Sequence, residues 1–290
     1  MTLIRLSGCK INLLLNILGK RADGFHELET VMQPVALHDE LAFSRGGSGI
    51  RLTCSNPALP VDSTNLVHRA AAAFLETARI TEGVGIHLTK NIPMAAGLGG
   101  GSGNAATTLL GLNELFSHLL APGQLLPIAA RLGSDVPFFL QHQPALGIGR
   151  GEQVEPLTPF SALNGAWMLL IHPGFGISTP WAYRELANFP DALHGRPGRA
   201  QELIALLQAD DLAAAGAAFY NSLEVPALHK HPILALYQDF LRAHGAEAAL
   251  MSGSGSTTFA IVRGQAAAET LREQFMAKFG PANWTALVPL

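Results

Sequence analysis

A glycine-rich stretch decides the fold, and it reads Asn91-Ile92-Pro93-Met94-Ala95-Ala96-Gly97-Leu98-Gly99-Gly100-Gly101-Ser102-Gly103-Asn104-Ala105-Ala106. Five glycines fall within positions 97–103. Before them, residues 86–91 alternate between apolar and polar side chains, which is typical of a β-strand. After them, apolar residues recur every three or four positions from Ala105 to Leu119, which predicts one face of a helix.

A glycine loop that leads into a helix is typical of a phosphate site. It presents unpaired backbone N–H groups and the positive end of the helix dipole, and glycine lets an anion approach closely. The alternative is a flexible connection, but each glycine costs roughly 0.5–1 kcal/mol relative to alanine, and a plain connection would not need five of them. We therefore expect the loop to bind phosphate groups.

The loop belongs to neither of two common nucleotide-binding motifs. No Gly-Lys-Ser/Thr ends it, so it is not a Walker A loop. It also lacks the spacing of a dinucleotide-binding motif, because Ser102 stands where the third glycine would be needed.

Composition bounds the class of protein. The 290 residues are 48% hydrophobic and 14% charged, which predicts a folded chain of two domains. A net charge of −3 argues against broad nucleic-acid binding. Two cysteines, Cys9 and Cys54, give no disulfide framework and fit a reducing cytoplasm. No apolar run reaches the roughly 18–20 residues that span a bilayer, and too few residues precede the lipoprotein-like box at 6–9 for a secretory signal.

The N-terminal half contains polar residues in places that suggest chemistry. Lys10 and Asn12 are two apart on a predicted strand over residues 2–18, so they share one face, although Lys10 also suits an exposed strand edge. Phe25 and His26 follow an Asp-Gly turn. Taken alone, Phe25 is better interpreted as an ordinary core residue and His26 as a surface histidine. Asp135 follows a predicted helix and suits either a turn cap or a carboxylate in a dry cleft.

Other patterns predict elements rather than sites. Residues 31–43 predict two short strands broken near Pro34 and residues 38–39, and residues 45–50 predict a hairpin. A helix is expected over residues 65–78, with Asp62, Ser63 or Thr64 as its cap.

The C-terminal half predicts a different layout. Its strands and helices, with the middle helices set aside, follow the order β-α-β-β-α-β of a ferredoxin-like domain. The segment Met251-Ser252-Gly253-Ser254-Gly255-Ser256 joins the two central strands. It is either a plain hairpin turn or a further donor of backbone N–H and hydroxyl groups to a phosphate.

These motifs together resemble the GHMP kinase superfamily. Within it, the turn Asp23-Gly24-Phe25-His26 and the run Leu132-Gly133-Ser134-Asp135-Val136-Pro137 are similar to the branch that phosphorylates 4-diphosphocytidyl-2-C-methyl-D-erythritol in the non-mevalonate isoprenoid pathway. The resemblance runs through most of the chain and also rests on Lys10-Ile11-Asn12-Leu13, Gly19-Lys20-Arg21, Pro93 with residues 97–102, Gly149-x-Gly151-Glu152, Asn221-Ser222-Leu223-Glu224 and Met251-Ser252-Gly253-Ser254-Gly255.

The resemblance implies an α+β fold of two domains. The first, over residues 1–155, would be an ATP-binding α/β domain like ribosomal protein S5. The second, over residues 156–290, would be a ferredoxin-like α+β domain that binds substrate. The implied reaction is ATP-dependent phosphorylation of a substrate hydroxyl, giving the 2-phosphate and ADP, with Mg²⁺ as a cofactor.

The resemblance also assigns site residues. Asp135 would accept the hydroxyl proton, and Lys10 would lie beside it and offset developing charge, although a structural ion pair is the alternative. The implied ATP-binding residues are Asn65, Pro93, Met94, Ala95, Ala96, Gly97, Leu98, Gly99, Gly100, Gly101, Ser102 and Gly103. Ser102 is also the candidate ligand for Mg²⁺. The implied substrate-binding residues are Asn12, Phe25, His26, Thr179, Pro180, Gly253 and Ser254.

The chain departs from the family pattern at two places. Gly103-Asn104 stands where Ser-Asp is usual, which bears on metal binding, but Asn is a good helix cap, so we expect the helix start to survive. Ser222 stands where Asp is usual.

Two alternatives remain open. One is another small-molecule GHMP kinase, of the homoserine or mevalonate type, against which the Gly24-Phe25-His26 turn speaks. The other is a catalytically inactive nucleotide-binding sensor, against which the presence of Lys10 and Asp135 speaks. In each case we expect small-molecule partners rather than nucleic acid or membrane, and a cytoplasmic monomer or weak homodimer.

Overall fold

The computed structural model describes residues 2–290 and divides into two compact units. The first comprises the chain up to Cys9, Leu37–Pro93 and Gly99–His142, and the second comprises Lys10–Ala36, Met94–Leu98 and Gln143–Leu290. Two long strands, β1 (Thr2–Lys20) and β2 (His26–Arg45), contribute residues to both units. The expected domain boundary at residues 155–156 stays a prediction.

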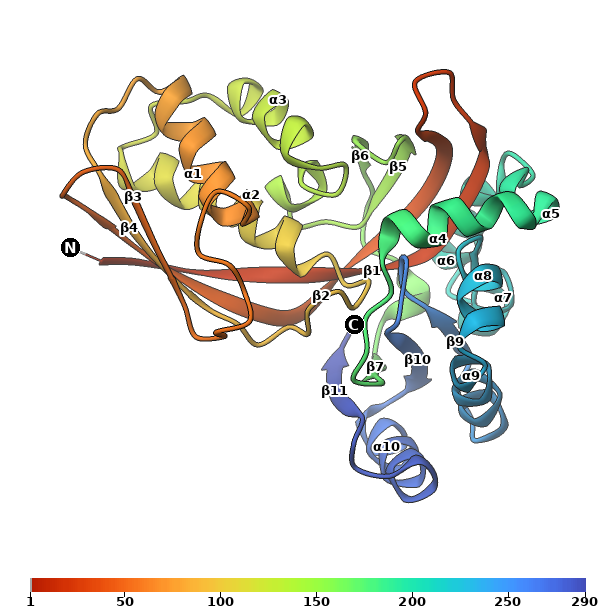
Figure 1. Ribbon diagram of the computed structural model, residues 1–290. Helices are drawn as coiled ribbons and strands as arrows, with labels where there is room; N and C mark the ends of the chain where they lie inside the picture. Colours follow the sequence, from red (N-terminus) through yellow and green to blue (C-terminus); the bar gives the residue numbers. More distant parts are fainter. Residues whose placement is uncertain (1) are drawn as a thin grey trace. The chain divides into compact units, whose positions relative to one another are not determined.

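In the first unit, a small sheet is covered by helices. β4 (Val84–Thr89) pairs in parallel with β3 (Ile50–Cys54) and antiparallel with the end of β2. The helices α1 (Leu66–Thr77), α2 (Gly100–Leu115) and α3 (Pro122–Leu132) pack on one another and lie on one face of these strands (Figure 1), and the short helix η1 (Pro137–Leu140) follows.

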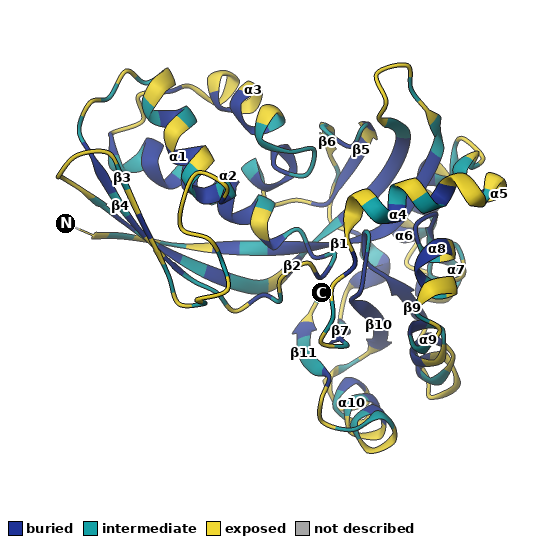
Figure 2. Ribbon diagram, viewed as in Figure 1, coloured by how far each residue is buried: buried dark blue, intermediate teal, exposed yellow. Residues whose placement is uncertain are grey.

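The second unit contains an antiparallel sheet in the order β11-β7-β10-β9. Its strands are β7 (Ala166–His172), β9 (Ala248–Met251), β10 (Thr258–Arg263) and β11 (Trp284–Pro289). Helix α9 (Ile233–Ala243) packs on β9 and β10, and α10 (Gln265–Phe279) packs on β7, β10 and β11. β7, β9 and β10 are largely buried, β11 is mostly half-buried, and the outer faces of both helices are exposed (Figure 2). The order confirms the predicted ferredoxin-like arrangement.

Shorter elements complete the second unit. β5 (Ala145–Gly149) pairs with the start of β2 and with β6 (Gln153–Pro156), and β8 (Tyr220–Asn221) pairs with β1. The remaining elements are η2 (Ser161–Leu163), α4 (Thr179–Glu185), η3 (Leu186–Asn188), α5 (Pro190–Leu193), α6 (Arg199–Gln208), α7 (Leu212–Ala217) and α8 (Glu224–Lys230). No helix within residues 2–290 is long and apolar enough to cross a bilayer.

The predicted break in β2 is wrong. The strand is continuous from His26 to Arg45 and lies next to β1 in the sheet. It pairs with β5 up to Met32 and with β4 from Glu40. Pro34 lies between the two pairings, where neither strand needs its missing N–H. The predicted hairpin at residues 45–50 is also wrong, because β2 and β3 pair with opposite edges of β4 rather than with each other.

Both helices near the glycine loop begin at residues other than those predicted. α1 is capped by Asn65, whose Oδ1 accepts from Val67 N at 2.9 Å, and not by residues 62–64. α2 begins at Gly100, so Asn104 lies inside it and does not cap it. The helix ends at Leu115, and Leu119 is exposed rather than part of its buried face.

Candidate active site

In the first unit, a buried ion pair holds the chain where it enters the glycine loop. Lys90 Nζ lies 2.7 Å from Asp39 Oδ2, and the two side chains are 5% and 0% exposed. Asp39 Oδ1 accepts hydrogen bonds from the backbone N–H groups of Asn91 (2.7 Å) and Ile92 (2.8 Å), and Lys90 Nζ donates to Ile92 O. One carboxylate therefore fixes three successive residues just before Pro93.

The glycines that begin α2 allow close packing. A Cβ at Gly100 would lie 3.1 Å from Ile92 Cγ2, and a Cβ at Gly103 would lie 2.4 Å from Gly8 O. The helix turn at Gly103 therefore lies against the backbone of β1, and a side chain at this position would need the strand to move. Ser102 is half-buried in the first turn of α2, and the adjacent Asn104 is buried with no hydrogen-bond partner for its Oδ1 among residues 2–290.

In the second unit, the earlier part of the glycine loop interlocks with the Ser-Gly loop that joins β9 to β10. Gly97 has φ +76°, and a Cβ there would lie 2.0 Å from Ser252 O. Ser252 Oγ donates to Gly97 O at 2.9 Å, and Thr257 N donates to Ala96 O at 3.1 Å. Gly253 faces the same segment, since a Cβ there would lie 2.9 Å from Gly97 O. The two loops that were predicted to hold phosphates are therefore in direct contact.

Lys10 and Asn12 lie beside these loops on β1. Lys10 N donates to Leu98 O at 2.9 Å, and its buried Nζ donates to Asn12 Oδ1. Asn12 Nδ2 donates in turn to Thr30 Oγ1 (2.8 Å), which donates to Leu14 O (2.6 Å). This chain of bonds fixes which end of the Asn12 amide carries the oxygen. A Cβ at Gly253 would lie 3.3 Å from that oxygen, so Lys10, Asn12 and both loops meet at one place.

The side chains of Asn221 and Glu224 hold the Ser-Gly loop by hydrogen bonds to its backbone. Asn221 Nδ2 donates to Met251 O (2.7 Å) and to Gly253 O (2.8 Å). Glu224 Oε1 accepts from Met251 N at 2.7 Å and from the Gln238 amide. Burial raises the pKa of Glu224 to about 7, although these two hydrogen bonds and the charge of Arg242 oppose the rise.

The predicted substrate residues are also found in the second unit. Thr179 Oγ1 and Ser254 Oγ are 2.8 Å apart and share a hydrogen bond. Pro180 is exposed in the first turn of α4, where its fixed φ suits a helix start. His26 contacts Tyr183 of the same helix, with ring centroids 5.0 Å apart. Burial and the charge of Lys20 lower the pKa of His26, so its neutral ring offers one donor and one acceptor at neutral pH.

Asn65 and Asp135 lie in the first unit. Asp135 is half-buried in the turn that links α3 to η1. Asn65 is 8% exposed, and both ends of its amide are engaged, since Oδ1 caps α1 and Nδ2 donates to Pro60 O at 2.7 Å. Leu66, the next residue, lies against Gly101 of α2. The roles of Asp135 as base and of Asn65 near ATP stay predictions.

Sequence reasoning missed several supporting residues. Asp39 was interpreted as part of a strand break, Asn221 and Glu224 only as motif positions, and Tyr183 not at all. A signal was present for Asp39, because an aspartate within a strong strand pattern needs a buried partner. At the Ser222 departure, the serine hydroxyl accepts a hydrogen bond from Ile17 N at 3.0 Å.

The arrangement in the second unit is suited to an anion beside an alcohol. Backbone segments rich in glycine, the hydroxyls of Thr179 and Ser254 and the ammonium group of Lys10 are gathered with an oriented amide, Asn12. Groups of these types are able to bind phosphate oxygens and to position a hydroxyl. Residues 2–290 contain no cluster of three His, Cys, Asp or Glu residues that would hold a metal ion without help from a ligand.

Comparisons with known proteins agree with this chemistry. The family model described as the GHMP kinases N terminal domain matches residues 65–143, and the GHMP kinases C terminal model matches residues 190–282. A 4-diphosphocytidyl-2-C-methyl-D-erythritol kinase of Syntrophus aciditrophicus is 42% identical over 284 residues, which cover 96% of this chain and 95% of the relative. The kinase of the same name from Moorella thermoacetica is 43% identical, with 87% of each chain covered.

Solved structures of kinases also match this chain. A crystal structure of 4-(cytidine 5'-diphospho)-2C-methyl-D-erythritol kinase matches with a TM-score of 0.79 and 33% identity, over 99% of this chain and 100% of the other. A homoserine kinase from Cytophaga hutchinsonii matches with a TM-score of 0.75 over 100% of this chain and 95% of that one, but at 19% identity, which shows the shared fold alone. The chain has the two-domain GHMP kinase fold, and it belongs to the 4-diphosphocytidyl-2-C-methyl-D-erythritol kinase family of the GHMP kinases.

Proposed function

We propose that this protein transfers the γ-phosphoryl group of ATP to a hydroxyl of 4-diphosphocytidyl-2-C-methyl-D-erythritol, giving the 2-phosphate and ADP. The observation that carries the proposal is the meeting of Lys10, Asn12, Gly97 and Gly253 at one place in the second unit. The relatives that share 37–43% identity with most of this chain are named for that substrate.

Phosphoryl transfer depends mainly on positioning and charge neutralisation. In the proposed reaction, the substrate hydroxyl oxygen forms a bond to the γ-phosphorus while the bond to the β–γ bridging oxygen breaks. Asp135 accepts the hydroxyl proton, and ADP leaves with the bridging oxygen. Lys10 offsets charge that develops on the transferred group, and Asn12, fixed by Lys10 and Thr30, orients the hydroxyl region.

The glycine segments would hold the nucleotide phosphates. The first N–H groups of α2 are suited to this because they have no partner within the helix and lie at the positive end of its dipole. We expect N–H groups of the Ser-Gly loop to add further donors. Thr179 and Ser254 would add hydroxyl donors, and Phe25 and the neutral ring of His26 would hold the cytosine by stacking and hydrogen bonding.

The residues present fit a magnesium ion that arrives with ATP. Mg²⁺ usually keeps several waters and takes only one or two protein oxygens besides the phosphates, so it needs no cluster of carboxylates. Ser102, half-buried in the first turn of α2, is the residue that we expect to contact it. The bound ion would neutralise charge on the phosphates.

We also expect a small-molecule enzyme of the cytoplasm that acts as a monomer or weak homodimer. Cys9 and Cys54 form no disulfide, which is consistent with a reducing compartment.

A substrate panel tests the proposed function. ADP release, coupled to NADH oxidation, is measured with ATP and each of three alcohols: the cytidyl alcohol, homoserine and mevalonate. We expect turnover with the cytidyl alcohol alone. Turnover of homoserine or mevalonate in its place would assign the protein to another GHMP activity, and ATP binding without any turnover would indicate a sensor.

A further inference from the structure

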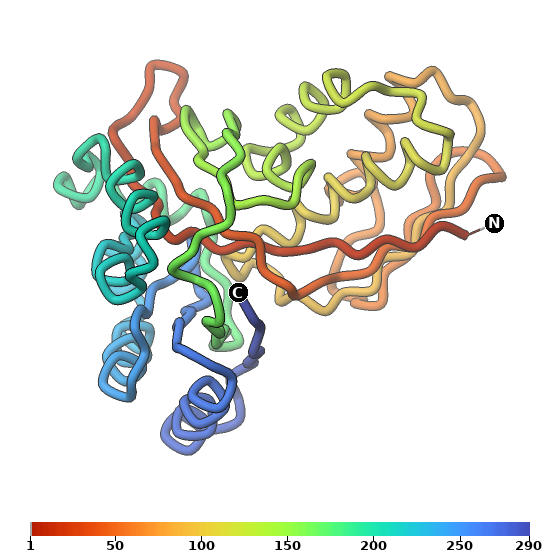
Figure 3. Tube along the Cα trace, turned by 180° about the vertical axis from the view of Figure 1, so that it is seen from behind, coloured from red at the N-terminus to blue at the C-terminus, as the bar shows by residue number. Residues whose placement is uncertain are grey.

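Arg150 lies on the tight turn between β5 and β6. The glycines on either side, Gly149 and Gly151, have φ of +72° and +95°, and Gly151 N donates to Ile148 O at 3.0 Å. Since Gly149 pairs with Leu28 at the start of β2, this turn lies next to the turn that links β1 to β2. Both views of the backbone place the two turns side by side (Figures 1 and 3). The family resemblance covers Gly149, Gly151 and Glu152 but leaves position 150 open.

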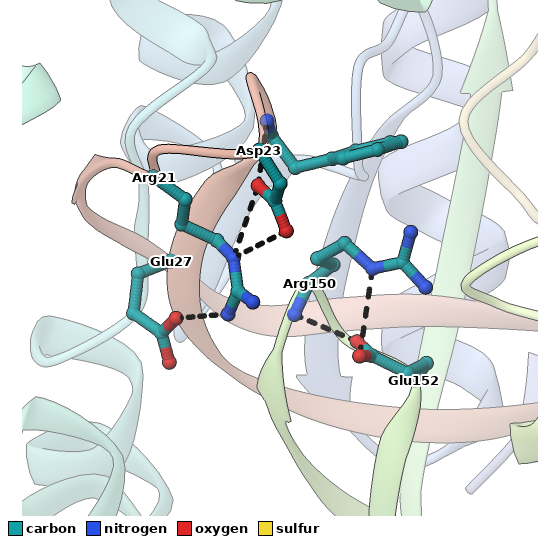
Figure 4. Close-up of polar contacts among 6 residues, drawn as sticks. Arg21, Asp23, Glu27, Arg150 and Glu152 are labelled. Carbon is teal, nitrogen blue, oxygen red and sulfur yellow. Dashed lines mark hydrogen bonds and ion pairs between the residues drawn. The ribbon is translucent and has the colours of Figure 1, made fainter.

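The guanidinium group of Arg150 covers the ring of Phe25. Its Cζ lies 4.6 Å from the ring centroid, within the range of a cation–π contact. Arg150 Nε lies 3.4 Å from Glu152 Oε1, and Arg150 N donates to Glu152 Oε2 at 2.7 Å (Figure 4). The outer end of Arg150 therefore contacts the ring, and its charge also contributes to lowering the pKa of Asp23 in the same turn.

Arg21, by contrast, is used to build the turn. Its guanidinium pairs with Asp23 at 3.1 Å and with Glu27 at 2.5 Å (Figure 4). Asp23 Oδ1 also accepts from Phe25 N at 3.1 Å, and Arg21 N donates to Phe25 O at 2.7 Å. These bonds fix the backbone of Phe25, but they leave its ring free to change rotamer.

The ring of Phe25 keeps a large open surface. Phe25 is 51% exposed even with the guanidinium over it, so a flat ring has room to stack there. An exposed aromatic ring loses rotamer freedom when it binds a partner, and a contact that already holds it reduces that loss.

We propose that Arg150 is a positioning residue that holds the ring of Phe25 from one side, so that the cytosine of the substrate stacks on the open side. This inference rests on the proposed function, because it needs a substrate with a base. In this role Arg150 does not contact the reacting atoms. Loss of the guanidinium should therefore weaken binding of the cytidyl alcohol and leave the chemical step unchanged.

A double-mutant cycle tests the inference. We would measure kcat, and KM for both the cytidyl alcohol and ATP, in the wild type, Arg150→Met, Phe25→Ala and the double variant. Arg150→Met should raise KM for the cytidyl alcohol about two- to fivefold, the range of one exposed cation–π contact, with kcat and KM for ATP unchanged. In the Phe25→Ala background the same change should have no further effect. Arg150→Lys should restore part of the affinity, because a cation remains.

Arg45 offers a matched control in the first unit. Its guanidinium lies 4.4 Å from the ring centroid of Phe116 and 2.6 Å from Glu82, so Arg45→Met removes the same kind of contact elsewhere. Arg45→Met should leave kcat, KM for the cytidyl alcohol and KM for ATP unchanged.

The other outcomes overturn the inference in distinguishable ways. An equal effect of Arg150→Met with and without Phe25 would mean that Arg150 acts on the substrate directly. A change in kcat and in KM for ATP, together with a lower melting temperature, would mean that its role is only structural. A wild-type protein that phosphorylates another alcohol but not the cytidyl alcohol would overturn the proposed function and this inference together.

Discussion

Lys10 and Asn12 are two polar residues on β1 whose side chains are held in place by hydrogen bonds. A buried lysine is costly unless its ammonium group is hydrogen bonded, and here it donates to Asn12 Oδ1. The Asn12 amide is held at its other end by Thr30. Both groups are therefore oriented before any ligand binds, which is the condition for efficient electrostatic catalysis.

Asp135 gives the first prediction at this scale. Asp135→Asn keeps the size of the side chain but removes the proton acceptor, so we expect kcat to fall by about 10²–10⁴, the usual range for a lost general base. The dissociation constant for ATP, measured by calorimetry, should stay within about twofold because ATP binding does not use this proton. Asp239→Asn is the control, since Asp239 is an exposed residue of α9 that pairs with Arg242 at 3.6 Å. Near-normal turnover in Asp135→Asn would remove Asp135 as the base.

Gly97 gives the second prediction. Gly97→Ala places a Cβ 2.0 Å from Ser252 O at a φ of +76°, so it must displace the Ser-Gly loop. Gly245→Ala is the matched control, because Gly245 also has a positive φ (+94°) but nothing within 4 Å of a Cβ. We expect Gly97→Ala to lower the melting temperature more than the control and to raise KM for ATP. Equal effects of the two substitutions on stability and on KM would contradict the interlocked loops.

At the scale of elements, the turn between β4 and the glycine loop depends on one carboxylate from β2. Asp39→Asn leaves the ammonium group of Lys90 buried without its counter-charge, which costs about 3 kcal/mol in typical buried pairs. We expect urea unfolding to show a loss of that order for Asp39→Asn. The double variant Asp39→Asn/Lys90→Met should be more stable than the sum of the two single changes predicts. Additive losses would mean that the pair is not coupled.

Much of the element order could be predicted from the sequence, and the failures have physical causes. The ferredoxin-like order was predictable because β7 and β9 are short continuous apolar runs and α9 has a clear helical repeat of apolar residues. The continuity of β2 was not, because Pro34 is harmless only where neighbouring strands stop pairing, and the pairing is not visible in one strand. The early start of α2 was hidden because its glycines favour loops, and only their close packing against Ile92 and Gly8 explains them.

The candidate site was predictable only in part. Motifs pointed to Lys10, Asn12, Gly97 and Gly253, which the structure brings together. Arg150 could not have been found, because no pattern in the sequence indicates that the turn after β5 lies against Phe25. Asn221 likewise supports a loop 30 residues away in the chain.

At the scale of the whole molecule, Glu224 links folding stability to pH. Its carboxyl titrates near 4.5 in the unfolded chain and at about 7 in the folded protein, so the folded state binds more protons between these values. The contribution of Glu224 to stability is therefore greatest below about pH 4.5, falls as the pH rises towards 7, and is constant above that. The total fall is on the order of 3 kcal/mol.

This linkage gives a pH prediction. Glu224→Gln mimics the protonated form, so the free energy of unfolding in urea should rise relative to the wild type between pH 5 and pH 8. Glu273→Gln, an exposed change on α10, is the control and should follow the wild-type curve. Parallel curves for Glu224→Gln and wild type would show that the buried carboxyl does not titrate in this range.

We propose that one phosphoryl group passes from ATP to one hydroxyl of the cytidyl alcohol in each turnover. The most direct measurement is phosphorus NMR of the reaction mixture, with ADP measured in parallel. We expect one new phosphomonoester signal for each ADP formed. Its carbon–phosphorus coupling should place the ester on the oxygen at position 2. ADP that accumulates with inorganic phosphate and without that ester would contradict it.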